Sequence, residues 1–197
     1  KAVVHMPKGS TKTRFDNIAK EGAKVTIEEV NYDDCVRMAA AEAEATPHGV
    51  VVQDTAWEGY EEIPAWIMQG YGTMAMEAGE QLKAQGCERP THIFVQAGVG
   101  SLAGAVVGYF SNLYADNLPT FVVVEAEAAA CLYKGAAAGE SGAAPFGALA
   151  AMMTMDEYKD LRNDIGLDEN SKVLLFSTEG DTDPDRYKNI VWKGLDK

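Results

Sequence analysis

The stretch that decides the fold is Gln96-Ala97-Gly98-Val99-Gly100-Ser101-Leu102-Ala103-Gly104. A strand-like run over residues 91–95 precedes it, and a helix-like run over residues 102–114 follows it. A glycine-rich turn between a strand and a helix exposes backbone N–H groups at the positive end of the helix dipole. The stretch therefore predicts an anion site, usually one for a phosphate. The alternative is a tight turn that needs small residues only for packing.

Strand-like and helix-like segments alternate along the rest of the chain. Further strands are expected over residues 2–6, 24–28, 49–53, 121–125 and 173–177. Further helices are expected over residues 10–20, with Ser10 as N-cap, and over 32–45, about 67–82 and 144–153. Apolar strands separated by helices predict an α/β fold of mostly parallel sheets covered by helices.

Polar residues follow three of these segments, and they are the first candidates for a site. Ligands of open parallel sheets bind beyond the carboxyl ends of the strands. Asp54, the glycine loop and the pair Ser177-Thr178 are expected at such ends. The aromatic segment 55–60 is interpreted as a crossover between two lobes, so the chain is divided into residues 1–54 and 55–197.

Composition excludes several classes of partner. The formal net charge is -13 and no basic patch stands out, which argues against nucleic acid and anionic membrane surfaces. No apolar run is long enough to span a membrane. The three cysteines are widely spaced and show no metal-site pattern, so no metal is expected, and reduced thiols in the cytoplasm are favoured.

Seven strings along nearly the whole chain together resemble the fold type II, tryptophan-synthase-β-like family of pyridoxal-phosphate enzymes. They are Met6-Pro7-Lys8-Gly9-Ser10, Asn31-Tyr32-Asp33-Asp34 and residues 52–60, 67–71, 96–100, 139–143 and 177–183. The glycine loop and the Ser177 region are shared across the superfamily. The strings Gln-Asp-Thr-Ala-Trp-Glu-Gly-Tyr and Ser-Thr-Glu-Gly-Asp-Thr-Asp are typical of its ammonia-lyases.

The resemblance implies a two-lobed enzyme with pyridoxal 5'-phosphate as cofactor. The implied reaction is α,β-elimination of 2,3-diaminopropionate, a small amino acid, to pyruvate and ammonia in a homodimer. The cofactor phosphate would lie on the glycine loop, at Gly98, Val99, Gly100, Ser101 and Leu102. Ser177 would hydrogen-bond the pyridine nitrogen, or Thr178 would, since strand alternation decides which side chain faces the ring. Glu140 would open a helix near the ring.

Asp54 is the candidate catalytic base. A carboxylate buried at a strand end can have its pKa raised toward the working pH, and the resemblance places an acid–base aspartate of the lyases here. The alternative is an Asp that caps the following turn. Trp57 and Tyr60 are expected to shape the substrate pocket, with packing between lobes as the alternative.

The chain also departs from the family pattern. The Schiff-base lysine, in a Ser-Phe-Lys-type motif, and the loop that clamps the phosphate lie upstream in the family, and neither occurs here. The chain opens inside a strand, so the true N-terminus is expected to be absent. A long family segment is nearly missing between residues 133 and 140. We therefore expect an incomplete chain whose numbering crosses a gap there.

Other functions stay open from the residues. Another enzyme of the same fold, such as a threonine or serine dehydratase or a β-replacement synthase, would use the same glycine loop. A non-catalytic ligand-binding module is supported by the missing lysine. A nucleotide-binding Rossmann domain lacks its third glycine here, although Glu125 ends the next strand as that fold requires.

Overall fold

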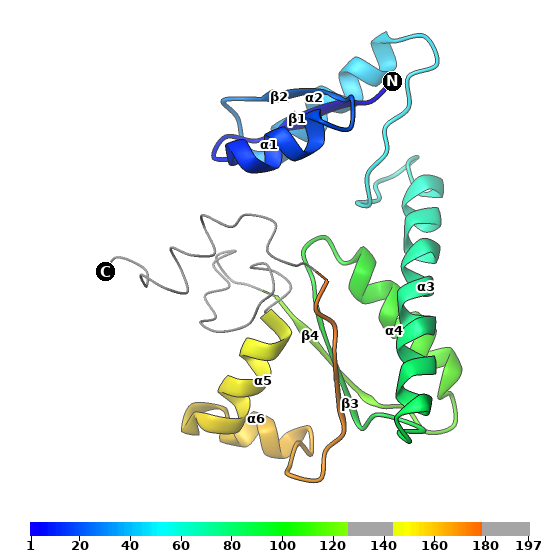
Figure 1. Cartoon of the computed structure of the whole chain (residues 1–197), viewed down its shortest axis with the longest axis vertical. Coiled ribbons are helices and arrows are strands. Elements are labelled where there is room, and N and C mark those ends of the chain that lie inside the picture. Colours follow the sequence, from blue (N-terminus) through cyan, green and yellow to red (C-terminus); the bar gives the residue numbers. More distant parts are fainter. Residues whose placement is uncertain (126–143, 179–197) are drawn as a thin grey trace. The chain divides into compact units, whose positions relative to one another are not determined.

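The structure, a computed structural model, describes residues 1–125 and 144–178 of the chain (Figure 1). Chain contacts divide it into two compact units that separate between Val52 and Gln53. The expected division fell two residues later, and the assignment of these units to a small and a large lobe stays a prediction. Glu140 and the expected gap between residues 133 and 140 lie outside the described residues.

The first unit is a two-stranded parallel sheet with two helices. Its elements are β1 (Val3–Met6), α1 (Lys12–Ala19), β2 (Lys24–Ile27) and α2 (Tyr32–Ala45). The strands pair in register from Val3 with Lys24 to Met6 with Ile27. Asn31 caps α2, as expected, because its side chain accepts a hydrogen bond from the amide of Asp34 at 2.9 Å.

The cap of α1 differs from the expectation. Thr11, not Ser10, is the N-cap, and its side chain accepts from the amide of Arg14. The Ser10 hydroxyl instead donates to the carbonyl of Pro7 at 2.8 Å. Both residues can cap a helix, and the turn that follows Pro7 uses the first of them.

The strand expected over residues 49–53 is wrong. That segment has no strand structure, and Val50 and Val52 are 65% and 72% exposed. The chain leaves α2 through a sharp turn, in which a side chain on Gly49 would overlap the backbone of Ala43. An apolar run forms a strand only where a partner strand pairs with it, and the described residues provide none here.

The second unit is a three-stranded parallel sheet between helices. Its elements are α3 (Glu62–Ala84), β3 (His92–Gln96), α4 (Ser101–Leu113), β4 (Thr120–Val124), α5 (Ala144–Thr154), the 3₁₀ turn η1 (Asp156–Tyr158), α6 (Lys159–Asp164) and β5 (Val173–Leu175). The strand order is β4-β3-β5, and both pairings are parallel. The short helix α6 is an addition to the expected elements. None of the helices in the described ranges is long and apolar enough to cross a membrane.

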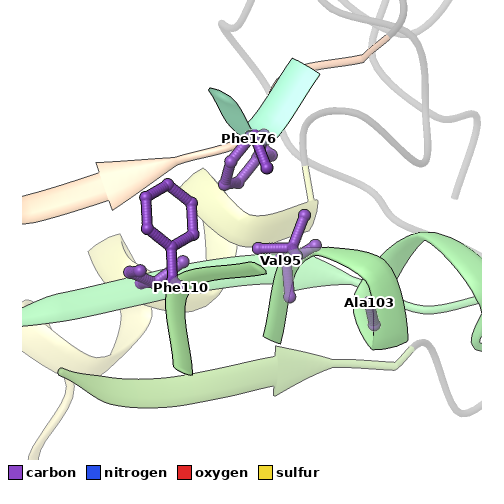
Figure 2. Packing of buried hydrophobic residues seen from close by; sticks show 7 residues of the cluster. Val95, Ala103, Phe110 and Phe176 are labelled. Carbon is purple, nitrogen blue, oxygen red and sulfur yellow. The ribbon is translucent and has the colours of Figure 1, made fainter. Parts of the chain in front are cut away.

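Two apolar layers bury the central strand β3, whose five residues are all buried. Helices α3 and α4 lie together over one face of the sheet, and α5 and α6 lie over the other (Figure 1). On the first face, Val95 of β3 packs with Ala103 and Phe110 of α4 and with Phe176 (Figure 2). Because α4 is fixed on β3 by this core, its first residue is held at the carboxyl end of the central strand.

Candidate functional site

The glycine loop lies where the sequence placed it, between the carboxyl end of β3 and the first turn of α4. Gly100 is the N-cap residue of α4 and has φ +93°, a left-handed conformation that favours glycine. Gly98, Val99 and Gly100 are exposed, whereas Ser101 is buried. The loop is therefore open to solvent at the positive end of the helix.

The backbone amides of this loop are not consumed by the fold. Within the described part of the chain, no N–H group of residues 98–103 donates a hydrogen bond, and the helix ladder begins with the amide of Gly104 bonded to the carbonyl of Gly100 at 2.8 Å. Gly100 offers no side-chain cap to the first turn. Several N–H groups at one helix terminus are thus available to an anion.

Gly98 gives independent support for a ligand. Its φ is not positive, and a Cβ built on it would meet no atom within 4 Å. Nothing in the described part of the chain therefore requires glycine at this position. A ligand that approaches the backbone closely would require it, because the Cβ would occupy the ligand's place.

Asp54 lies beside this loop, although not at the end of a strand. The Ser101 hydroxyl donates a hydrogen bond of 2.5 Å to the backbone carbonyl of Asp54. The Asp54 side chain is half-buried, and its carboxylate accepts no hydrogen bond from any residue that the structure describes. The structure brings the backbone of Asp54 to the first residue of α4, and no described residue bonds the carboxylate.

The two aromatic candidates form one compact turn. The rings of Trp57 and Tyr60 stack with centroids 4.2 Å apart, and the amide of Tyr60 donates to the carbonyl of Trp57 at 2.8 Å. The Tyr60 hydroxyl accepts from the amide of Gln53 at 3.0 Å and donates to its carbonyl at 3.2 Å. Trp57 is 39% exposed. The phenol is therefore bound to the backbone next to Asp54, and Trp57 stays partly exposed to solvent.

Gln96, the last residue of β3, connects this edge of the sheet to the segment that follows β5, and the sequence did not predict it as a site residue. Gln96 is 93% buried, and its side-chain amide donates to the Thr178 hydroxyl at 2.6 Å. Ser177 and Thr178 are both exposed. A polar residue at the end of an otherwise apolar buried strand, directly before the glycine loop, was the signal that could have identified Gln96.

Unsatisfied buried polar atoms gather at this edge. In the described residues, four side-chain polar atoms are buried without a hydrogen-bond partner: Oε1 of Gln53, Oγ1 of Thr55 and Oε1 of Gln96 belong to this region, and the fourth is the Tyr114 hydroxyl, just beyond the other end of α4. Buried polar atoms are normally paired, so these three atoms indicate that neighbouring groups complete the site. No group of histidine, cysteine and carboxylate residues in the described ranges could hold a metal ion.

The fold and the site define a class of protein: a parallel α/β domain with exposed backbone amides in a glycine loop at the carboxyl edge of the sheet, and beside it an aspartate whose carboxylate no described residue bonds. The sequence profile of the pyridoxal-phosphate dependent enzymes matches residues 1–172. This chain belongs to that family. The fold type II architecture and the resemblance drawn from the sequence are thereby confirmed.

Individual relatives are more specific. A diaminopropionate ammonia-lyase of Salmonella typhimurium is 40% identical over 98% of this chain and 64% of its own length. The Escherichia coli diaminopropionate ammonia lyase in apo form has a TM-score of 0.86 and 39% identity, covering 99% of this chain and 63% of that one. The same Escherichia coli lyase in complex with an aminoacrylate-PLP azomethine reaction intermediate has a TM-score of 0.85 and 35% identity, covering 99% and 66%.

The chain is shorter than the regions that it matches. It spans 64% of the Salmonella protein, and the alignment runs over 261 positions although the chain has 197 residues. At least 64 positions of that alignment, the difference between the two lengths, therefore have no counterpart in this chain. A length difference of this kind accords with the sequence interpretation of a missing family segment.

Proposed function

We propose that this chain carries part of the active site of a pyridoxal-phosphate-dependent lyase that eliminates ammonia from 2,3-diaminopropionate. One observation carries the proposal: the backbone carbonyl of Asp54 accepts a hydrogen bond from Ser101, the first residue of α4. This contact holds the backbone of Asp54 beside the place where the cofactor phosphate would bind, and no described residue bonds its carboxylate. The likeness to enzymes of that name, at 40% identity, supports the same reaction.

The residues of the loop suit the cofactor. Amides of Gly98 to Leu102 would hold the phosphate, since a helix N-terminus with free N–H groups is a general anion site. When bound, pyridoxal phosphate supplies the electron sink that makes the Cα proton of an amino acid acidic. The protein's part is to hold the phosphate, orient the ring and manage protons.

Asp54 would accept the Cα proton. Its carboxylate is not used by any described residue, so it can take up a proton without breaking a structural bond. Loss of the Cα proton and of the β-amino group forms the carbon–carbon double bond, and the protonated amine leaves as ammonia. Hydrolysis then gives pyruvate, so one diaminopropionate and one water yield one pyruvate and two ammonia molecules.

Of the two candidates Ser177 and Thr178, we infer that Thr178 would meet the pyridine nitrogen. Its oxygen already accepts a hydrogen bond from the Gln96 amide, so its own proton remains for another acceptor. An unprotonated ring nitrogen is such an acceptor. A neutral hydroxyl there leaves the ring a weaker electron sink, which suits elimination because the departing β-amino group removes the charge promptly.

The remaining site residues extend this proposal. The exposed Trp57 side chain would line the substrate pocket, and Tyr60 would support it. Glu140 lies outside the described residues, and its role stays what the family resemblance implies. We also propose a homodimer in the cytoplasm. The location is supported by Cys35 and Cys87, which form no disulfide in the described part of the chain, and the dimer by the family resemblance.

A product assay tests this function. The purified enzyme, in a form that includes the Schiff-base lysine expected upstream of this sequence, is incubated with pyridoxal phosphate and with diaminopropionate, serine or threonine in parallel. The 2-oxo acid is measured by its reduction with NADH and lactate dehydrogenase. Pyruvate from diaminopropionate at the highest rate is the expected result. Preferred turnover of serine or threonine would assign the chain to a dehydratase. If no product forms and the absorbance spectrum of the cofactor does not change, both enzyme hypotheses are wrong and a non-catalytic ligand-binding module is favoured.

A further inference from the structure

The Ser101 hydroxyl is committed to a tertiary contact rather than to its own helix. Ser101 is the first residue of α4, and a serine that caps a helix lies one position earlier, where the N-cap is Gly100. Its hydroxyl donates instead to the carbonyl of Asp54, 47 residues away in sequence, at 2.5 Å. Only its amide is left as a donor for an anion.

The segment that contains Asp54 is held almost entirely through its backbone. Besides the Asp54 carbonyl, the amide and the carbonyl of Gln53 are both bonded to the Tyr60 hydroxyl. The side chain of Gln53 then turns back and donates to the carbonyl of Thr55 at 3.1 Å. These bonds fix the main chain on both sides of Asp54 and use no atom of its carboxylate.

The other end of the Ser101 contact is rigid. Ala103, Val106 and Phe110 anchor α4 in the core on β3 and are at most 5% exposed, and Figure 2 shows Ala103 in this packing two residues after Ser101. Among the hydrogen bonds around Asp54 described above, only the bond from Ser101 comes from α4. If the N-terminus of α4 becomes less mobile, this single hydrogen bond therefore also restricts the backbone of Asp54.

We propose that Ser101 is a positioning residue that couples occupancy of the anion loop to the placement of Asp54. The inference rests on the proposed function. An anion on the amides of residues 98–102 tightens the first turn of α4, and the Ser101 hydroxyl transmits this order to the main chain of Asp54. The backbone of Asp54 is then least mobile when an anion is bound to the glycine loop.

The test uses inorganic phosphate as the probe and amide hydrogen exchange as the readout, so it needs no turnover. In the wild-type protein, phosphate should slow exchange in peptides covering residues 98–104 and also in those covering 53–60. Ser101→Ala should keep the first effect and lose the second. Without phosphate, exchange in residues 53–60 should be roughly 2- to 10-fold faster in this variant, as expected for the loss of one hydrogen bond.

Two further variants make the result specific. Ser101→Thr keeps the hydroxyl and should restore the coupling between the two peptides. Ser111→Ala removes a serine from the same helix, ten residues away, and should behave as the wild type. The proposal predicts, in addition, that Ser101→Ala lowers kcat for diaminopropionate while the affinity for pyridoxal phosphate changes little.

The outcomes separate this inference from the proposed function. If phosphate protects residues 98–104 but never 53–60, or if Ser101→Ala keeps both effects, the coupling is wrong and the anion loop stands. If phosphate protects neither segment of the wild-type protein, both the anion loop and the coupling are wrong. Retained coupling in Ser101→Ala with loss in Ser111→Ala would also overturn the role of Ser101.

Discussion

At the scale of single residues, the site depends on what each polar group has left unused. Asp54 is fixed by its carbonyl, and its carboxylate stays available. Thr178 accepts from Gln96 and keeps its own proton to donate. The amides of the glycine loop have no acceptor in the described chain. A structure in which these groups were paired with one another would be stable but could not bind or react.

Replacing the Asp54 carboxylate by an amide tests its role as a base. Asp54→Asn keeps the size of the side chain and the backbone bond from Ser101 but cannot accept the Cα proton. We expect turnover of diaminopropionate to fall at least about 100-fold, the usual contribution of a general base, with cofactor affinity retained. Steady-state kinetics and a cofactor titration measure the two quantities. Wild-type turnover in this variant would make Asp54 structural only.

Gly98→Ala tests whether the loop holds an anion. The added methyl group meets no described atom and the backbone needs no positive φ there, so the free energy of unfolding should change by less than about 0.5 kcal/mol. Phosphate and cofactor affinity should fall at least about tenfold, because the methyl group takes the ligand's place. Calorimetric titration and denaturant unfolding measure these effects.

A glycine further along α4 provides the matched control. A Cβ on Gly108 also meets no atom within 4 Å, and this residue lies two helical turns beyond the loop. Gly108→Ala should leave binding unchanged and stabilise the helix by up to about 1 kcal/mol. Equal binding losses in the two variants would mean that the Gly98 effect is not local.

At the scale of elements, the sequence predicted those helices, strands and turns that depend on neighbouring residues alone. The turn at Gly100 needs a positive φ, and the buried strand before it needs continuous apolar residues, so this unit could be read directly. The false strand over residues 49–53 shows the limit: its apolar composition was right, but pairing depends on a partner that composition does not reveal. The contacts of Ser101 and Gln96 cross 47 and 82 residues, and no local pattern encodes them.

A half-buried histidine links three elements of the first unit. His5 of β1 lies between two carboxylates, with Nδ1 3.0 Å from Glu28 Oε1 and Nε2 2.8 Å from Glu42 Oε2. The hydrogen bond with Glu28 raises the pKa of His5 above its ordinary value of about 6.5, burial opposes this, and Glu42 raises it further. Thr26 also contacts the ring, and Lys24 lies 3.8 Å from Glu42.

This arrangement predicts how the stability of the unit depends on pH. A pKa raised in the folded state means that folding favours the protonated imidazole. The stabilisation is fully present below about pH 6.5 and is lost as pH rises through the raised pKa. Unfolding followed by hydrogen exchange in β1 and β2 should therefore show decreasing stability above that pH, and His5→Gln should flatten the dependence.

Two measurements separate His5 from other groups. An NMR titration of the imidazole gives the pKa of His5 directly, and a value at or below 6.5 would contradict the prediction. The exposed His48 lies beyond α2, and His48→Gln should leave the pH dependence unchanged. Measurements are kept above about pH 5.5 because the pKa of Glu28, lowered chiefly by the Thr26 hydroxyl and then by His5, affects stability only in more acidic solution.

At the scale of the whole molecule, chain contacts separate two units between Val52 and Gln53, two residues before the division expected from the sequence, and the assignment of these units to two lobes stays a prediction. The signal was compositional: an apolar run ends and an aromatic, polar segment begins. The arrangement of the proposed site was less accessible, because the sequence predicted Asp54 at a strand end, whereas its carbonyl is held by the Ser101 hydroxyl of α4.

The net charge of the whole chain affects how an anionic ligand reaches this loop. The formal charge is -13, and residues 96–104 contain no lysine or arginine, so attraction comes from amides at short range and repulsion from the molecule at long range. Raising the ionic strength from 0.01 to 0.15 M shortens the screening length from about 30 to about 8 Å. We expect the association rate of pyridoxal phosphate, followed by stopped-flow absorbance, to rise a few-fold over this range.

The direction of this salt effect distinguishes two kinds of site. A site built from lysine and arginine side chains would bind more slowly as salt screens their attraction, so a falling rate would contradict an amide-lined loop in an acidic protein. The double variant Glu77→Gln, Glu80→Gln removes two negative charges from exposed positions of α3 and provides the control. It should bind faster than the wild type at 0.01 M salt and equally fast at 0.15 M, because the repulsion it relieves is the part that salt screens.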